Sequence, residues 1–154
     1  MARTVEAAND SARASRGGLW SAVARSWRRR PWWMNLTWYF CLYMTFVYMP
    51  YDLFIKPVAE DQEVWFGFML TGWAAKATEP LHWAIYAAGA YGFWKMSPWM
   101  WPWAAVYLAQ VVIAMGLFPL LNDMGSAWTG LVAAALFAVP TVALWRARHR
   151  FREA

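Results

Sequence analysis

The sequence predicts an all-α integral membrane protein, a four-helix bundle with both termini in the cytoplasm. The chain of 154 residues is 61% hydrophobic and 15% charged, whereas a typical soluble domain is about 25% charged. Its charged residues gather in short stretches between long apolar blocks, which is the pattern of membrane spans and their connecting loops. Most of the 14 Trp lie near the ends of these blocks, as in the aromatic belts of membrane proteins.

The remaining totals exclude several classes of protein. The net charge of +5 comes from basic residues at the two tails, beside apolar blocks, where they act as topology signals, so we expect no nucleic-acid partner. The single cysteine, Cys41, excludes an internal disulfide and a CxxC redox motif. The first thirty residues contain no continuous apolar run, so we expect the first span to be an uncleaved anchor.

The amino-terminal region is expected to have two parts. Residues 1–17 are polar and weakly patterned, and we predict a disordered tail. Residues 18–30 form a basic amphipathic segment that lies in the interface. Membrane lipids with anionic headgroups are its predicted partners, through Arg25, Arg28, Arg29 and Arg30.

The next part, 31–146, is predicted to be a four-span transmembrane domain, with spans at about 32–51, 78–94, 98–121 and 126–145. The first covers roughly 20 residues, enough for a core of about 30 Å. The second has its apolar stretch from Pro80, a residue that suits a first helical turn. Residues 147–154 follow as a basic cytoplasmic tail.

The first external loop contains an apolar stretch that is too short to cross a bilayer as a helix. We predict an interfacial amphipathic helix over about 61–76, with the acidic residues Glu60, Asp61 and Glu63 at its amino-terminal end. A re-entrant half-helix and a lid over the bundle remain alternatives.

The distribution of Lys and Arg sets the predicted orientation. Four spans place both tails on one side, and all Lys and Arg except Lys56 and Lys76 then lie on that side. The positive-inside rule therefore predicts a bacterial-type cytoplasmic (inner) membrane protein with cytoplasmic amino and carboxyl termini.

Two rows of small residues predict close helix packing. One row is Ala84, Ala88 and Gly92, and the other is Gly130, Ala134 and Ala138. Residues four apart share a helix face, and small ones let a second backbone approach closely. Such rows are compatible with a homo-oligomer or with a larger membrane complex.

The candidate catalytic residues are Glu79, His82, Asp52 and Asp123, all at the outer ends of predicted spans. Glu79 and His82 lie at i and i+3, on one helix face. Glu-x-x-His is half of a di-iron motif, but the chain has no second copy, so we predict no metal site. Carboxylates near a histidine can bind a cationic group or relay protons, whereas the alternative is that they only mark the outer headgroup level.

The aromatic residues suggest a possible lipophilic ligand, and no cofactor is predicted with it. Tyr86, Tyr91, Tyr107 and Gln110 are the candidate ligand-binding residues. Gln110 is an amide in an apolar span, which needs a partner, and Tyr86 or Tyr91 is the expected one.

The function expected from these features is that of a non-catalytic accessory or scaffold subunit of a membrane complex. The chain lacks a phosphate-binding loop, a GxSxG motif and an HExxH motif. A membrane-embedded enzyme or a binding protein for a lipophilic ligand, with Glu79 and His82 at its outer mouth, is the alternative. A small oligomeric transporter is the second alternative.

Overall fold

The computed structural model describes residues 18, 21, 23, 24 and 26–152. The predicted tail 1–17, Arg25 and the last two residues lie outside these residues. The chain divides into two compact units, residues 1–37 and 38–154, which are described separately. The described chain is mostly helical, with one small β-hairpin.

In the first unit, Arg30 is turned inward. Its side chain is 4% exposed, and it donates hydrogen bonds to Asn35 Oδ1 at 2.8 Å and to Ser26 Oγ at 3.0 Å. The Asn35 amide in turn donates to the Trp27 carbonyl at 3.1 Å. The Arg30 guanidinium thus takes part in a local network, and the predicted contact of this segment with lipid headgroups stays a prediction.

The segment predicted as the first span is helical but not uniformly α-helical. It comprises α2 (Trp32–Tyr43), the π-helical η1 (Met44–Tyr48) and α3 (Met49–Phe54). The Thr45 hydroxyl in η1 donates to the Cys41 carbonyl at 2.7 Å, and the Thr45 carbonyl accepts a hydrogen bond from Trp83 Nε1 at 2.8 Å. A π-turn frees backbone carbonyls from the regular helical pattern, and here a tryptophan binds one of them.

The helix predicted over 61–76 is wrong at its centre. After η2 (Val58–Glu60), strands β1 (Gln62–Trp65) and β2 (Phe68–Thr71) pair antiparallel, with Gln62 opposite Thr71. Phe66 and Gly67, the two turn residues, have φ of 51° and 92°, and two positive φ values define a hairpin turn of type I′. Aromatic and β-branched residues suit strands, so a stretch too short for a span folds back on itself.

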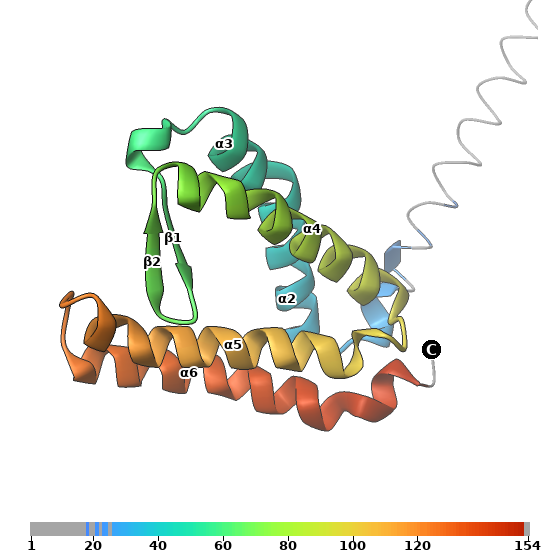
Figure 1. Cartoon of the computed structure of the whole chain (residues 1–154). Helices are drawn as coiled ribbons and strands as arrows, with labels where there is room; N and C mark the ends of the chain where they lie inside the picture. Colours follow the sequence, from blue (N-terminus) through green and yellow to red (C-terminus); the bar gives the residue numbers. More distant parts are fainter. Residues whose placement is uncertain (1–17, 19–20, 22, 25, 153–154) are drawn as a thin grey trace, which may run out of the picture. The chain divides into compact units, whose positions relative to one another are not determined.

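The longest helix is α4 (Trp73–Lys95), which begins ahead of the predicted boundary at residue 78. α5 (Met100–Leu121), α6 (Ala127–Arg146) and the 3₁₀-helical η3 (Ala147–Phe151) follow. α5 and the helical stretch from Ala127 to Phe151 are long and apolar enough to cross a membrane, by length and composition. Figure 1 shows α5 and α6 side by side, and they pack extensively, whereas α4 contacts α5 only locally.

The two predicted rows of small residues differ in their surroundings. On α6, Gly130 lies against Pro119 of α5, and Ala134 lies opposite Gly116, with Ala138 half-buried. On α4, Ala84 and Ala88 are exposed. Gly92, the third residue of that row, is buried against Met100.

Candidate functional site

Five charged side chains form a buried cluster where α3, η2 and α4 meet, which we call the ion cluster: Asp52, Lys56, Asp61, Lys76 and Glu79. The three acidic residues are at most 1% exposed. Each offers a carboxylate oxygen, and these oxygens all lie within 4.8 Å of one another. The fold thus brings acidic residues from α3, from the end of η2 and from α4 into one buried cluster.

The two lysines of the ion cluster connect these carboxylates. Lys56 Nζ lies 2.9 Å from both Asp52 Oδ1 and Asp61 Oδ1. Lys76 Nζ lies 3.3 Å from both Asp61 Oδ2 and Glu79 Oε1. Lys76 also donates to the backbone carbonyls of Asp52 and Lys56, so it ties α4 to the end of α3.

Three carboxylates share two ammonium groups, so one carboxylate is favoured to hold a proton. Burial works to raise the pKa of Asp61, but hydrogen bonds with Glu79 and the two lysines outweigh it and hold that pKa low. Burial raises the pKa of Glu79 to about 7, with further contributions from the Asp61 hydrogen bond and the charges of Asp52 and Asp61. Glu79 precedes the apolar stretch that starts at Pro80, and its raised pKa makes it the acidic residue of the cluster that takes up a proton most readily.

The spacing of the three carboxylates would suit a cation. The ammonium groups of Lys56 and Lys76 already contact these oxygens. A metal ion would have to displace both lysines, so the geometry favours an ion-pair network.

A second group of side chains, which we call the histidine site, lies beside the ion cluster on α4. His82 Nδ1 is 3.2 Å from Glu63 Oε2 on β1. The His82 ring stacks on Trp65, with ring centroids 4.4 Å apart and 3° between the planes. The hairpin therefore supplies both the carboxylate and the aromatic surface that orient this histidine.

The histidine site continues toward α5 through two tyrosines. The Tyr86 ring lies 6.3 Å from the His82 ring and 6.3 Å from the Tyr107 ring. The two tyrosine hydroxyls are 3.5 Å apart. A carboxylate, an imidazole and two phenols thus follow one another, a set that can donate and accept hydrogen bonds.

The predicted candidates separate into those the structure brings together and those it leaves apart. Asp52 and Glu79 lie in the ion cluster, and His82, Tyr86 and Tyr107 lie in the histidine site. Asp123 is exposed in the turn after α5, and Tyr91 is exposed on α4. Gln110 is half-buried, and within residues 26–152 no hydrogen bond joins it to Tyr86 or Tyr91, its expected partners.

The sequence interpretation missed five of the residues that form these sites: Lys56, Asp61, Lys76, Glu63 and Trp65. Two spacings could have indicated the lysines, because Asp52 and Lys56 are i,i+4 and Lys76 and Glu79 are i,i+3. For Asp61 and Glu63 the sequence predicts a helix terminus, whereas the structure places Glu63 in strand β1 and Asp61 directly before it.

Comparisons of the chain with protein-family models, with curated proteins and with solved structures found no match.

Proposed function

We propose that the protein is a small multi-pass protein of a bacterial-type inner membrane and serves as a non-catalytic accessory subunit of a membrane complex. In this proposal four helical spans cross the bilayer, and both termini are cytoplasmic. The length and apolar character of α5 and α6 support the membrane location. The concentration of Lys and Arg at the two tails supports the orientation.

The observation that carries the accessory role is that two of the three small residues in the row on α4 are exposed. The row on α6 is covered within the chain by α5, whereas Ala84 and Ala88 are exposed. In a membrane, small residues on a helix surface favour contact with another helix, because backbones approach closely there. A helix of another chain is the partner that this surface fits.

The ion cluster supports a structural role for the charged residues. Its lysines and carboxylates bind each other, and they join α3, η2 and α4. Groups engaged in this way hold the outer part of the molecule in one arrangement.

Cysteine cross-linking in native membranes tests the proposal. Cys41 is replaced by Ala, and a single cysteine is then placed at Ala84 or Ala88. We expect both cysteines to cross-link to a protein partner, which mass spectrometry identifies. A cysteine at Ala135, an exposed residue of α6, is the matched control and should not cross-link.

Size measurement provides the second arm of this test. Ala84→Leu with Ala88→Leu should reduce the mass of the complex extracted in mild detergent, whereas Ala135→Leu should leave it unchanged. A wild-type protein that runs as a monomer, without cross-links at either α4 position, would contradict the accessory role.

The histidine site favours a second candidate function, binding of a lipophilic ligand that carries a polar group. His82 is held by Glu63 and Trp65 and is followed by Tyr86 and Tyr107, which gives one polar point between apolar helices. Mass spectrometry of molecules that copurify with the wild type tests this function. A ligand lost in His82→Gln and retained in Tyr91→Phe would support it, and equal retention in both would contradict it.

A further inference from the structure

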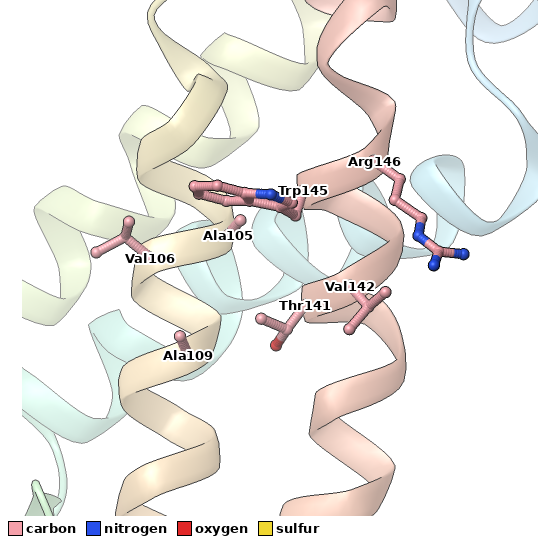
Figure 2. Close-up of a pocket in the computed structure, with 7 residues that line it drawn as sticks. All are labelled: Ala105, Val106, Ala109, Thr141, Val142, Trp145 and Arg146. Carbon is pink, nitrogen blue, oxygen red and sulfur yellow. The ribbon is translucent and has the colours of Figure 1, made fainter.

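A groove lies between α5 and α6, near the arginines at the end of α6. It has a volume of about 210 Å³. Figure 2 shows Ala105, Val106 and Ala109 on one helix and Thr141 and Val142 on the other. The groove spans about one helical turn, so it fits a short length of a narrow apolar chain.

The lining of the groove is apolar even where a polar residue contributes. The Thr141 hydroxyl donates to the Phe137 carbonyl at 2.7 Å, so its hydrogen-bonding capacity is used within α6. On the α5 side, the small side chains of Ala105 and Ala109 leave space for the groove. An occupant therefore meets methyl and methylene groups, as an acyl chain would.

One end of the groove is aromatic. Trp145 lines it, and its ring lies 5.4 Å from the Trp101 ring. Trp101 Nε1 also donates to the Trp145 carbonyl at 3.2 Å. Paired tryptophans are common at the level where acyl chains give way to headgroups.

Basic residues surround this aromatic pair. Arg146 lines the groove and extends its guanidinium away from it (Figure 2). Arg148 Cζ and Arg152 Cζ lie 5.1 Å and 5.8 Å from the Trp101 ring centroid. Within residues 124–152 there is no Asp or Glu, and in the described part of the chain no ion pair neutralises these arginines.

The segment that carries these arginines is anchored. Phe151 is 1% exposed, and its ring lies 6.1 Å from the Phe93 ring of α4. η3 therefore presents its arginines from a fixed turn of helix.

We propose that this groove binds an anionic phospholipid, with part of an acyl chain between α5 and α6 and the phosphate at Arg146 and Arg148. Apolar walls, an aromatic pair and a group of guanidiniums follow one another in the order of the parts of such a lipid. Arginine binds phosphate oxygens in a fixed, two-pronged geometry. The inference rests on the proposed membrane location.

Native mass spectrometry of the delipidated full-length protein, titrated with phosphatidylglycerol or phosphatidylcholine, tests the site. Phosphatidylglycerol should bind more tightly than phosphatidylcholine. Arg146→Gln with Arg148→Gln should weaken it about fivefold for each arginine, roughly 25-fold together. Lys95→Gln, at an exposed basic residue in the last turn of α4, is the control and should leave the affinity within about twofold.

The acyl part of the proposal needs its own variant. Ala109→Phe fills the groove and should reduce phosphatidylglycerol binding as strongly as the arginine changes, whereas Ala135→Phe on the exposed face of α6 should not. Circular dichroism confirms that each variant is folded.

Three results would overturn the lipid site. These are equal affinity for the two lipids, unchanged binding in the double arginine variant, and unchanged binding in Ala109→Phe. A change of oligomeric mass in Ala109→Phe, without a change in lipid affinity, would assign the groove to a second chain instead. Extraction of the protein from membranes by alkaline carbonate tests the location separately, and a soluble protein would contradict both proposals.

Discussion

His82 on α4 and Glu63 on β1 form a pair, with 3.2 Å between the imidazole Nδ1 and the carboxylate Oε2. The pair joins a helix to a hairpin that the sequence did not predict. Because the same imidazole stacks on Trp65, one side chain makes both the polar and the aromatic contact between the two elements.

Replacing His82 should loosen the hairpin locally. His82→Ala removes the contacts with Glu63 and Trp65, each of a kind that contributes about 1 kcal/mol or less. We expect faster hydrogen exchange at the β1 and β2 amides, equivalent to about 1–2 kcal/mol of lost protection. His82→Phe retains a ring on Trp65 and should lie between wild type and His82→Ala; identical exchange in all three would contradict the role.

Removing Lys76 should destabilise the ion cluster. Lys76→Met leaves Asp61 and Glu79, both fully buried, without the one cation that they share. Breaking a buried ion pair on one side costs about 3 kcal/mol, which denaturant unfolding in detergent measures. Lys95→Met, at an exposed position, is the control. An equal loss of unfolding free energy in the two variants would show that the ion cluster does not stabilise the fold more than a surface lysine does.

The stability of the protein should pass through a maximum in mild acid. The pKa of Asp61 is lowered from 3.8 to about 2, so its contribution is present above about pH 4 and is lost as pH falls toward 2. The pKa of Glu79 is raised from 4.5 to about 7. Between pH 4.5 and about pH 7, Glu79 therefore binds more protons in the folded state than in the unfolded state. Stability falls as pH rises through this range.

Melting temperatures from pH 2 to pH 8 measure both effects. We expect the highest value between about pH 4 and pH 5. Glu79→Gln mimics the protonated side chain and should abolish the decline above pH 4.5 while keeping the loss below pH 4. A variant that declines above pH 4.5 as the wild type does would assign that titration to another group.

Asn122 should hold the hairpin tip against the end of α5. Its amide donates to the Gly67 carbonyl at 2.7 Å and to the Phe118 carbonyl at 2.8 Å, and Met69 N donates to its Oδ1 at 3.3 Å. Asn122→Ala should cost about 2 kcal/mol for these bonds and should expose the turn at Phe66 to limited chymotrypsin digestion. Asp123→Asn, at the adjacent exposed residue, should leave the digestion rate unchanged.

The contact between α5 and α6 should tolerate a methyl group at one glycine and not at another. A Cβ at Gly130 would lie 2.5 Å from Pro119 Cγ and 3.0 Å from the Met115 carbonyl oxygen, neither of which moves easily. Gly130→Ala should therefore destabilise the helix pair by about 1–3 kcal/mol. At Gly116 the nearest atom would be 3.7 Å away, so Gly116→Ala should be neutral or slightly stabilising; thermal unfolding compares the two variants.

The helical elements could be predicted from the sequence because their signals are long. The blocks now seen as α5 and α6 are too apolar and too extended to be anything but helices. Glu79 and His82 were identified because i,i+3 spacing on a helix fixes a shared face. Asp52 was a candidate only by its position at a span end.

The rest of the candidate site depends on contacts between distant segments. Asp61 meets Glu79 only because the hairpin folds back between them, and the hairpin competes with a helix over the same short apolar stretch. Two positive φ values at Phe66 and Gly67 decide this competition, and a Phe gives little sign of such a conformation. Asp123 is a candidate from the sequence because of its membrane level alone, a criterion that does not bring side chains into contact.

The π-helical segment Met44–Tyr48 sets which way Asp52 faces. A π-turn adds one residue to the helix relative to regular α-helical winding, and one residue corresponds to a rotation of about 100°. With regular winding, Asp52 would point away from Asp61 and Glu79 even though no residue had changed in kind. The composition of the ion cluster thus depends partly on helical winding: converting Met44–Tyr48 to regular α-helix would turn Asp52 away, whereas deleting one residue between 44 and 48 as well would restore its direction.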